Sequence, residues 1–98
     1  MTIQSFSGFD WDQGNARKNE KHGVSQAEVE EVFSNRPLFV TRDEQHSQRE
    51  ERFLALGVSH AGRLLHVAFT MRGDEKKVRP ISARPMSRRE RVIYEKAS

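Results

Sequence analysis

Three apolar runs, joined by short links that contain glycine, fill much of the second half of the chain and constrain the fold most strongly. Two runs, Phe53–Val58 and Leu64–Arg72, are joined by residues 59–63, whose Gly62 suits a hairpin. Gly73 and Asp74 then turn the chain into a third run over residues 77–84. Short links favour antiparallel neighbours, so we expect a β-meander.

Side chains alternate between two faces of the strand predicted at Leu64–Arg72. One face carries Leu65, Val67, Phe69 and Met71, and the other carries His66, Ala68, Thr70 and Arg72. We expect the first face to build the core and the second to be available to a ligand. Pro80, in the third run, cannot donate a ladder hydrogen bond and indicates an edge strand or a bulge.

Helix signals lie on both sides of these strands. Asp12 can cap a helix over residues 12–22, which Gly23 would end in a left-handed conformation. Ser25 and Glu28 form a capping box for a second helix over residues 25–34. Ser87 and Glu90 form another for a closing helix. Met86, Val92, Ile93 and Ala97 are expected to give that helix an apolar side.

Shorter segments complete the expected architecture. Residues 9–11 and 38–40 are predicted strands, and the polar residues 41–51 form a mobile loop or a solvent-facing connection. The predicted fold is α+β in the order β-α-α-β-β-β-α, with an antiparallel sheet of about four strands, two N-terminal helices and a C-terminal helix. A chain of 98 residues has room for one core, so we expect one domain over 1–98, with residues 1–8 as a flexible lead.

Composition and charge narrow the class of protein. Hydrophobic residues make up 35% and charged residues 32% of the chain, which indicates a small folded core with a heavily charged shell. The formal net charge is +3, and acidic residues crowd the middle while cations dominate the C-terminal end. No cysteine is present, which excludes disulfides and cysteine-based zinc sites. No signal peptide or membrane-spanning run is recognisable, so we expect a cytoplasmic protein without membrane contact.

Arginines gather around the junction between the last predicted strand and the closing helix. The strand breaks at Arg84 and Pro85, and the helix begins near Ser87. A helix N-terminus favours anions through its free N–H groups and its dipole. The arginines that we expect around this junction are Arg72, Arg79, Arg84, Arg88, Arg89 and Arg91. Their natural ligand is a phosphate.

Several kinds of catalysis lack their sequence patterns. The four histidines, His22, His46, His60 and His66, fall in four different elements without metal-ligand spacing, so no metal is expected. The chain has no P-loop, no G-x-G-x-x-G and no G-x-S-x-G, so nucleoside triphosphate hydrolysis and serine hydrolase chemistry have no support. We therefore expect no cofactor.

The remaining side chains suit RNA cleavage without a metal ion. In that reaction the 2′-hydroxyl attacks the adjacent phosphorus, while a base, an acid and cations assist. Arg84 and Arg79 are candidates for the cations, or else are surface arginines, or pair with Glu90. His66 is a candidate acid or base, or else a half-buried structural histidine. Glu90 is a candidate base, or else serves only in its capping box.

Other polar side chains are candidates for contacting RNA. They are Asn19, Lys21 and His22 on the first predicted helix, Arg52 before a strand, Thr70 and Arg72 beside His66, and Arg88, Arg91 and Tyr94 on the closing helix. Structural alternatives exist for three of them. His22 can stabilise a helix end, Arg52 can pair with Glu50 or Glu51, and Tyr94 can pack under its helix.

Taken together, these residues resemble the BrnT family of bacterial type II toxins along nearly the whole chain. The matching segments are Phe9-Asp10-Trp11-Asp12, Asn19-Glu20-Lys21-His22-Gly23-Val24, Val32-Phe33, Glu51-Arg52 and Ile81-Ser82-Ala83-Arg84-Pro85, followed by Ser87, Glu90-Arg91 and Tyr94. The family-like polar positions are Asn19, Lys21, His22, Arg52, Arg84, Glu90 and Arg91. Two departures are Pro80, where an aliphatic residue is more usual, and the extension before Phe9.

The resemblance implies a RelE-like fold and a ribonuclease that cleaves RNA and so inhibits translation and growth. It also implies neutralisation by a cognate BrnA-type antitoxin, and binding of operator DNA only through the toxin–antitoxin complex. The alternative hypothesis is a non-catalytic module whose basic C-terminal helix binds nucleic acid or a protein. Such a module would bind RNA in a salt-dependent way and leave it uncut.

Overall fold

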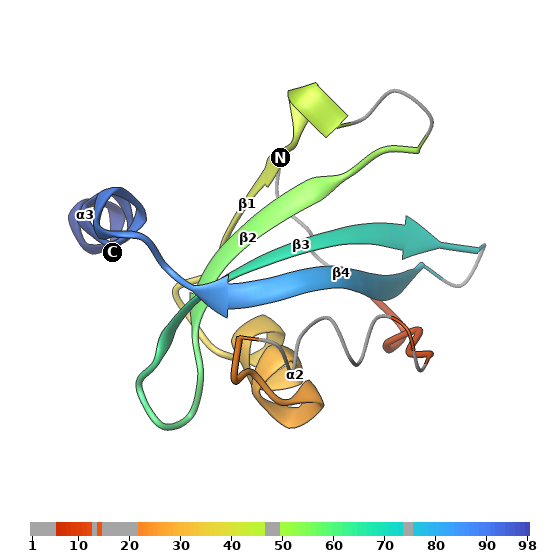
Figure 1. Cartoon of the computed structure of the whole chain (residues 1–98), viewed down its shortest axis with the longest axis horizontal. Coiled ribbons are helices and arrows are strands. Elements are labelled where there is room, and N and C mark those ends of the chain that lie inside the picture. The colour runs from red at the N-terminus through yellow and green to blue at the C-terminus, as the bar shows by residue number, and fades with distance from the viewer. Residues whose placement is uncertain (1–5, 13, 15–21, 47–49, 74–75) are drawn as a thin grey trace.

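A four-stranded sheet with one helix on each face makes up the computed structural model, which describes residues 6–12, 14, 22–46, 50–73 and 76–98. The elements follow in the order α2 (Gln26–Ser34), β1 (Phe39–Arg42), the 3-10 helix η1 (Glu44–His46), β2 (Phe53–Val58), β3 (Leu64–Arg72), β4 (Lys77–Pro85) and α3 (Arg88–Ala97) (Figure 1). None of these helices has the length and apolar character that a membrane crossing requires.

The strands form the meander that the apolar runs predict. All neighbours are antiparallel, in the order β1-β2-β3-β4. The link between β2 and β3 closes with a hydrogen bond from the Ser59 amide to the Arg63 carbonyl at 3.0 Å, and Gly62 has φ +85°. A side chain would be strained at that angle, so the glycine suits this turn. The α+β class and the hairpin are confirmed.

One face of the sheet packs against α2, and we call it the α2 face. Ser25 and Glu28 form the expected capping box, and Val29, Val32 and Phe33 are buried. The sheet contributes Val40, Phe53, Ala55, Leu65, Val67, Phe69, Val78 and Ala83 to the same core. The rings of Phe33 and Phe69 meet edge to face at 5.1 Å, which places the main core between α2 and the sheet.

A bulge in β4 changes which of its side chains share a face. Ala68 of β3 pairs with Ser82, but the next residue, Phe69, pairs with Pro80, so Ile81 is an extra residue in β4. Without the bulge, Arg79 and Arg84 would lie on opposite faces because their numbers differ by five. With it, Arg79 lies opposite Thr70 and Arg84 opposite His66. Pro80 thus lies beside a bulge in an edge strand, and both expectations for it are confirmed.

The opposite face of the sheet carries α3, and we call it the α3 face. Only the α3 side chain of Tyr94 is buried, with its hydroxyl donating to the Pro37 carbonyl at 2.6 Å. Val92 and Ile93 remain 45% and 52% exposed. The apolar side expected for this helix is only partly covered: Met86, just before α3, is buried, whereas Val92, Ile93 and Ala97 are exposed.

The N-terminal part differs from expectation where it is described. Phe9 makes an isolated parallel bridge to Val78 rather than a strand over residues 9–11. Gly23 has the expected left-handed φ of +70°, but most of the helix predicted over residues 12–22 lies outside the described residues. The described part holds two α-helices, and four strands follow α2 where the predicted order had three. The RelE-like assignment and the single-domain boundary stay predictions.

The polar connection between β1 and β2 is partly ordered by ion pairs. Strand β1 extends to Arg42, beyond the predicted end at Val40, and η1 follows. The Arg42 guanidinium contacts Glu44 at 2.5 Å and Glu51 at 3.3 Å. The solvent-facing connection that was one of the two expectations fits these residues, while residues 47–49 lie outside the description.

Candidate active site at the junction of β4 and α3

Arg84 lies at the end of β4 and forms a salt bridge with a carboxylate on the first turn of α3. Its Nη1 and Nη2 donate to the two oxygens of Glu90 at 2.8 and 2.9 Å, a bidentate pair. Nη1 also donates to the Pro85 carbonyl at 3.1 Å. The Arg84 side chain remains 39% exposed. The salt bridge to Glu90, which the sequence left as one alternative for Arg84, is therefore present.

Glu90 also completes the capping box of α3. Its Oε1 accepts from the Ser87 amide at 2.8 Å, and the Ser87 hydroxyl accepts from the Glu90 amide at 3.2 Å. Hydrogen bonds from Arg84, only partly opposed by desolvation, lower the Glu90 pKa from its ordinary value of 4.5 to about 2. A carboxylate with so low a pKa is a weak general base near neutral pH. The geometry therefore favours the structural alternative for Glu90.

His66 lies directly across the ladder from Arg84, on the α3 face. The residue is 9% exposed, and its Nε2 is 3.8 Å from Glu90 Oε2. Within the described part of the chain, its buried Nδ1 has no hydrogen-bond partner. Desolvation lowers the His66 pKa below its ordinary 6.5, and the nearby Arg84 lowers it further. The imidazole is therefore neutral at pH 7 and able to accept a proton.

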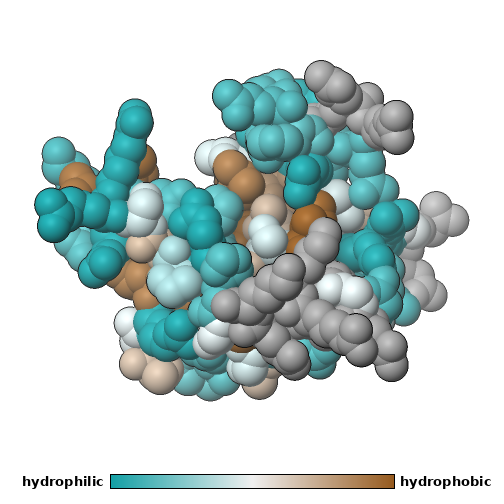
Figure 2. Space-filling view, in the orientation of Figure 1, coloured by the Kyte–Doolittle hydropathy of each residue, from teal (hydrophilic) through white to brown (hydrophobic). Residues whose placement is uncertain are grey.

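An open groove adjoins His66 and Glu90, between α3 and the α3 face of the sheet. Its volume is about 390 Å³, and its lining residues are Phe39, Thr41, Leu54, Leu56, His66, Glu90, Ile93 and Ala97. In Figure 2 the outline is hollowed between the projecting helix and the part of the molecule that carries η1. His66 and Glu90 form the polar wall of this groove, and aliphatic and aromatic side chains form most of the rest.

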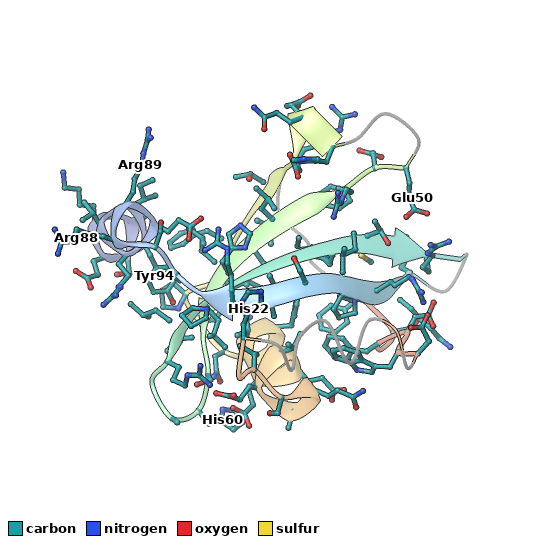
Figure 3. All side chains as sticks on the ribbon, viewed as in Figure 1. His22, Glu50, His60, Arg88, Arg89 and Tyr94 are labelled. Atoms are coloured by element: carbon teal, nitrogen blue, oxygen red, sulfur yellow. The ribbon has the colours of Figure 1, made fainter. Side chains whose placement is uncertain are left out.

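Arg79 shares the α3 face with Arg84 but contacts the N-terminal segment. Its Nη1 is 3.3 Å from Asp10 Oδ2, and its Nη2 donates to Asp12 Oδ2. These carboxylates, Asp12 foremost, raise the pKa of Arg79 above its ordinary value. Arg72 lies farther along the sheet, opposite Lys77, and pairs with Glu50 at 3.3 Å (Figure 3). The arginines expected around one junction therefore do not all lie there, because Arg79 and Arg72 lie farther along the α3 face than Arg84.

The other predicted RNA-contacting residues fall into three groups. Thr70 is buried beside Arg79, and Arg52 is half-buried just before β2. Arg88 and Arg91 are exposed on α3, whereas the Tyr94 ring packs edge to face on Phe39 at 5.5 Å (Figure 3). The structural alternative for Tyr94 is therefore present. His22 is exposed on the turn before α2, and Asn19 and Lys21 lie outside the described residues.

Sequence reasoning missed the apolar groove lining. Leu54 and Leu56 alternate with Ala55 and Gly57, so the run over β2 is apolar on both faces. A strand that is apolar on both faces is typical of a sheet covered on both sides, and this signal was available in the sequence. The sequence holds no comparable signal that α3 covers only part of the second face.

The arrangement brings together a guanidinium, a helix N-terminus and a neutral imidazole on the open face of an antiparallel sheet. In a small α+β protein, a guanidinium and a helix N-terminus are groups that favour anions such as phosphate. A family model described as "Ribonuclease toxin, BrnT, of type II toxin-antitoxin system" matches residues 11–90. The chain therefore belongs to the BrnT family of ribonuclease toxins, and the family implies an RNA target and a cognate antitoxin. A comparison with curated proteins found no match.

Proposed function

We propose that this ribonuclease toxin cleaves RNA without a metal ion, at the cluster formed by Arg84 and His66. The observation that carries the proposal is their cross-strand pairing, with His66 in the polar wall of an open groove. A cation and a proton acceptor side by side are what attack by a 2′-hydroxyl on the adjacent phosphorus requires. The bulge at Ile81 supports the proposal further, because it puts Arg79 on the same face.

Arg84 is proposed to bind the scissile phosphate. A guanidinium has five N–H donors, and the contacts made by described residues use three of them, two to Glu90 and one to Pro85. The Nε–H and one Nη2–H are left to donate to phosphate oxygens. Glu90 is proposed to orient the guanidinium rather than to move protons, in keeping with its low pKa.

His66 is proposed as the general base. Its neutral Nε2 takes the proton of the 2′-hydroxyl as the new bond from that oxygen to phosphorus forms. The bond from phosphorus to the 5′-oxygen breaks, and this oxygen leaves with a proton from solvent, while His66 later returns its proton to solvent. The products are a 2′,3′-cyclic phosphate and a 5′-hydroxyl, and Arg84 stabilises the extra negative charge of the phosphorane between them.

The remaining cations are proposed to hold the RNA on either side of the cut. Arg79, Arg72, Arg52, Arg88 and Arg91 would contact flanking phosphates, with Thr70 beside them and the N-terminal Asn19, Lys21 and His22 completing the binding surface. Because translated RNA lies in the cytoplasm, we place the activity there. Neutralisation by a BrnA-type antitoxin, and binding of operator DNA only as the toxin–antitoxin complex, belong to the same proposal.

The test compares Arg84→Ala and His66→Ala with the hairpin variant His60→Ala. We expect each of the first two to lower RNA cleavage in EDTA by about 100-fold or more and to relieve growth arrest. His60 is exposed within the β2–β3 turn and does not line the groove, so its variant should cleave normally. The acid limb of the wild-type rate profile should lie below pH 6.5, because the pKa of His66 is lowered.

Thermal unfolding of each variant shows whether a fall in cleavage comes from a missing side chain or from an unfolded protein. Unchanged cleavage in a folded Arg84→Ala protein would refute the site. Cleavage that requires added metal would refute the proposed mechanism. Salt-dependent RNA binding by the wild type without new RNA ends would favour the non-catalytic binding module.

A further inference from the structure

The groove between α3 and the sheet is left unfilled by the described residues. Tyr94, the buried side chain of α3, is not among the lining residues, and Ile93 lines the groove while remaining 52% exposed. A volume of about 390 Å³ falls within the range of about 300–1,000 Å³ that is typical of binding sites. A concave, mostly apolar site of this size with a polar wall can receive side chains of another molecule.

The lining suits aliphatic side chains better than nucleobases. RNA bases stack on flat aromatic or guanidinium faces. The groove offers Leu54, Leu56, Ile93 and Ala97 instead. Its one phenyl ring, that of Phe39, already packs edge to face with Tyr94 at an interplanar angle of 76°, and its imidazole, that of His66, lies in the polar wall. The contact chemistry is that of a protein helix laid into an apolar groove.

The charge around the groove indicates the sign of the charge that a partner should carry. Arg89 is four residues before Ile93 on α3 and Lys96 is three after it, so both share its side of the helix. Figure 3 shows Arg89 and Arg88 pointing in different directions, with Arg88 directed away from the sheet. The one carboxylate in the lining, Glu90, is already paired with Arg84. The rim is therefore positive along α3, which favours acidic partners on that side.

We propose that this groove is the docking site for an acidic amphipathic segment of the cognate antitoxin. Apolar side chains of that segment pack against Ile93, Leu54 and Leu56, and its carboxylates pair with Arg89 and Lys96. Because His66 lies in the polar wall, the bound segment covers the residue assigned as general base. That consequence rests on the proposed function, whereas the docking itself does not.

The experiment compares Ile93→Gln with Val92→Gln. Both residues are exposed, adjacent and apolar on α3, but only Ile93 lines the groove, and glutamine is a good helix former. The probe is the purified antitoxin encoded by the neighbouring reading frame, and calorimetry gives its Kd with each toxin variant. We expect Ile93→Gln to raise the Kd by about tenfold or more, and Val92→Gln to change it by less than about twofold.

Charge reversal gives a second, independent readout. Arg89→Glu should weaken antitoxin binding more than Arg88→Glu, and the difference should shrink as salt is raised. RNA cleavage by both glutamine variants, measured without antitoxin, should match the wild type. If the wild type does not cleave RNA but the variants change antitoxin affinity as expected, the proposed function is refuted and the docking site still stands.

Three results would overturn the docking site. The first is an equal effect of the two glutamine variants on antitoxin affinity. The second is a loss of RNA cleavage in Ile93→Gln with unchanged antitoxin affinity, which would assign the groove to a nucleobase. The third is a change confined to self-association, measured by sedimentation, which would assign it to a second copy of this chain.

Discussion

One carboxylate, that of Glu90, connects the helix cap, the candidate phosphate-binding arginine and the candidate base. It accepts from the Ser87 amide, pairs with both terminal nitrogens of Arg84 and lies 3.8 Å from His66 Nε2. The capping box fixes the carboxylate relative to the helix, and the bidentate pair fixes the guanidinium relative to the carboxylate. A local helix-start motif therefore also sets the position of a side chain on the preceding strand.

Glu90→Gln should make stability less dependent on pH in acid. Because the Glu90 pKa is lowered to about 2, its ionised form stabilises the fold fully above pH 4.5, and this contribution is lost as the pH falls towards 2. Glutamine keeps an acceptor for the cap but not the charge. We expect a cost of about 1 kcal/mol at pH 7, discounted because the Arg84 side chain is 39% exposed.

Urea unfolding at pH 7, 4 and 3 measures this difference. The gap between wild type and Glu90→Gln should be largest at pH 7 and should narrow as the pH falls. A gap that stays constant across this range would show that the cap, rather than the ion pair, accounts for the contribution of Glu90.

At the scale of elements, the packing of α2 on β2 depends on how closely the helix backbone approaches the sheet. Gly57 is buried in β2, and a Cβ built there would lie 2.6 Å from Cγ1 of Val32 and 3.4 Å from its carbonyl oxygen. The glycine therefore lets the helix backbone approach the sheet. Residues of the α2 face that pack under this helix, such as Ala55 and Val67, depend on that approach for their burial.

Gly57→Ala should destabilise the protein by about 1–3 kcal/mol, the usual cost of overpacking a core. Val32→Ala creates the missing space, so the double variant Val32→Ala with Gly57→Ala should lose less stability than the sum of the two single losses. Denaturant unfolding of all four proteins gives the coupling energy. Additive losses would mean that Val32 is not the residue that the new methyl group meets.

The elements show which parts of the fold the sequence could predict. Both capping boxes and the hairpin at Gly62 depend on residues a few positions apart, and each was predicted correctly. The pairing of His66 with Arg84 depends on the register of β3 and β4, which the extra residue Ile81 shifts. Pro80 indicated a bulge or an edge, but a proline does not specify which residue is the extra one.

The position of α3 was the least predictable feature of the candidate site. Val92 and Ile93 belong to the apolar side that the sequence predicts for this helix, yet they stay exposed while Tyr94 is buried. A periodic pattern reports that a helix has an apolar side, and it does not report what covers that side. The groove follows from this uncovered face, which only the folded arrangement reveals.

At the scale of the whole molecule, the positive charges differ in how far they are neutralised. Arg79, Arg72 and Arg84 on the α3 face each pair with a carboxylate, from the N-terminal segment, the end of the β1–β2 connection and α3 respectively. On α3 itself, Arg88, Arg89 and Arg91 make no ion pair with any described residue. On the proposed function, an RNA strand on the α3 face would compete with the protein's own carboxylates for Arg79.

Replacing Asp10 and Asp12 together by asparagine should strengthen RNA binding. The change releases Arg79 and raises the net charge by two from +3. A His66→Ala background should keep the RNA intact during fluorescence titrations of a single-stranded oligonucleotide. We expect several-fold tighter binding at about 50 mM salt, and a salt dependence steeper by about 0.7, as for one added phosphate contact.

Two controls decide whether the gain comes from Arg79 or from net charge alone. Adding Arg79→Ala to the double asparagine variant should abolish the gain. Glu44→Gln with Glu51→Gln removes the same two charges and releases Arg42, which alternates with Thr41 in β1 and so does not point to the α3 face. If this second pair tightens binding as much as the first, RNA responds to overall charge and Arg79 has no specific part in holding it. If only the first pair does, the N-terminal segment limits access to a phosphate site beside Thr70.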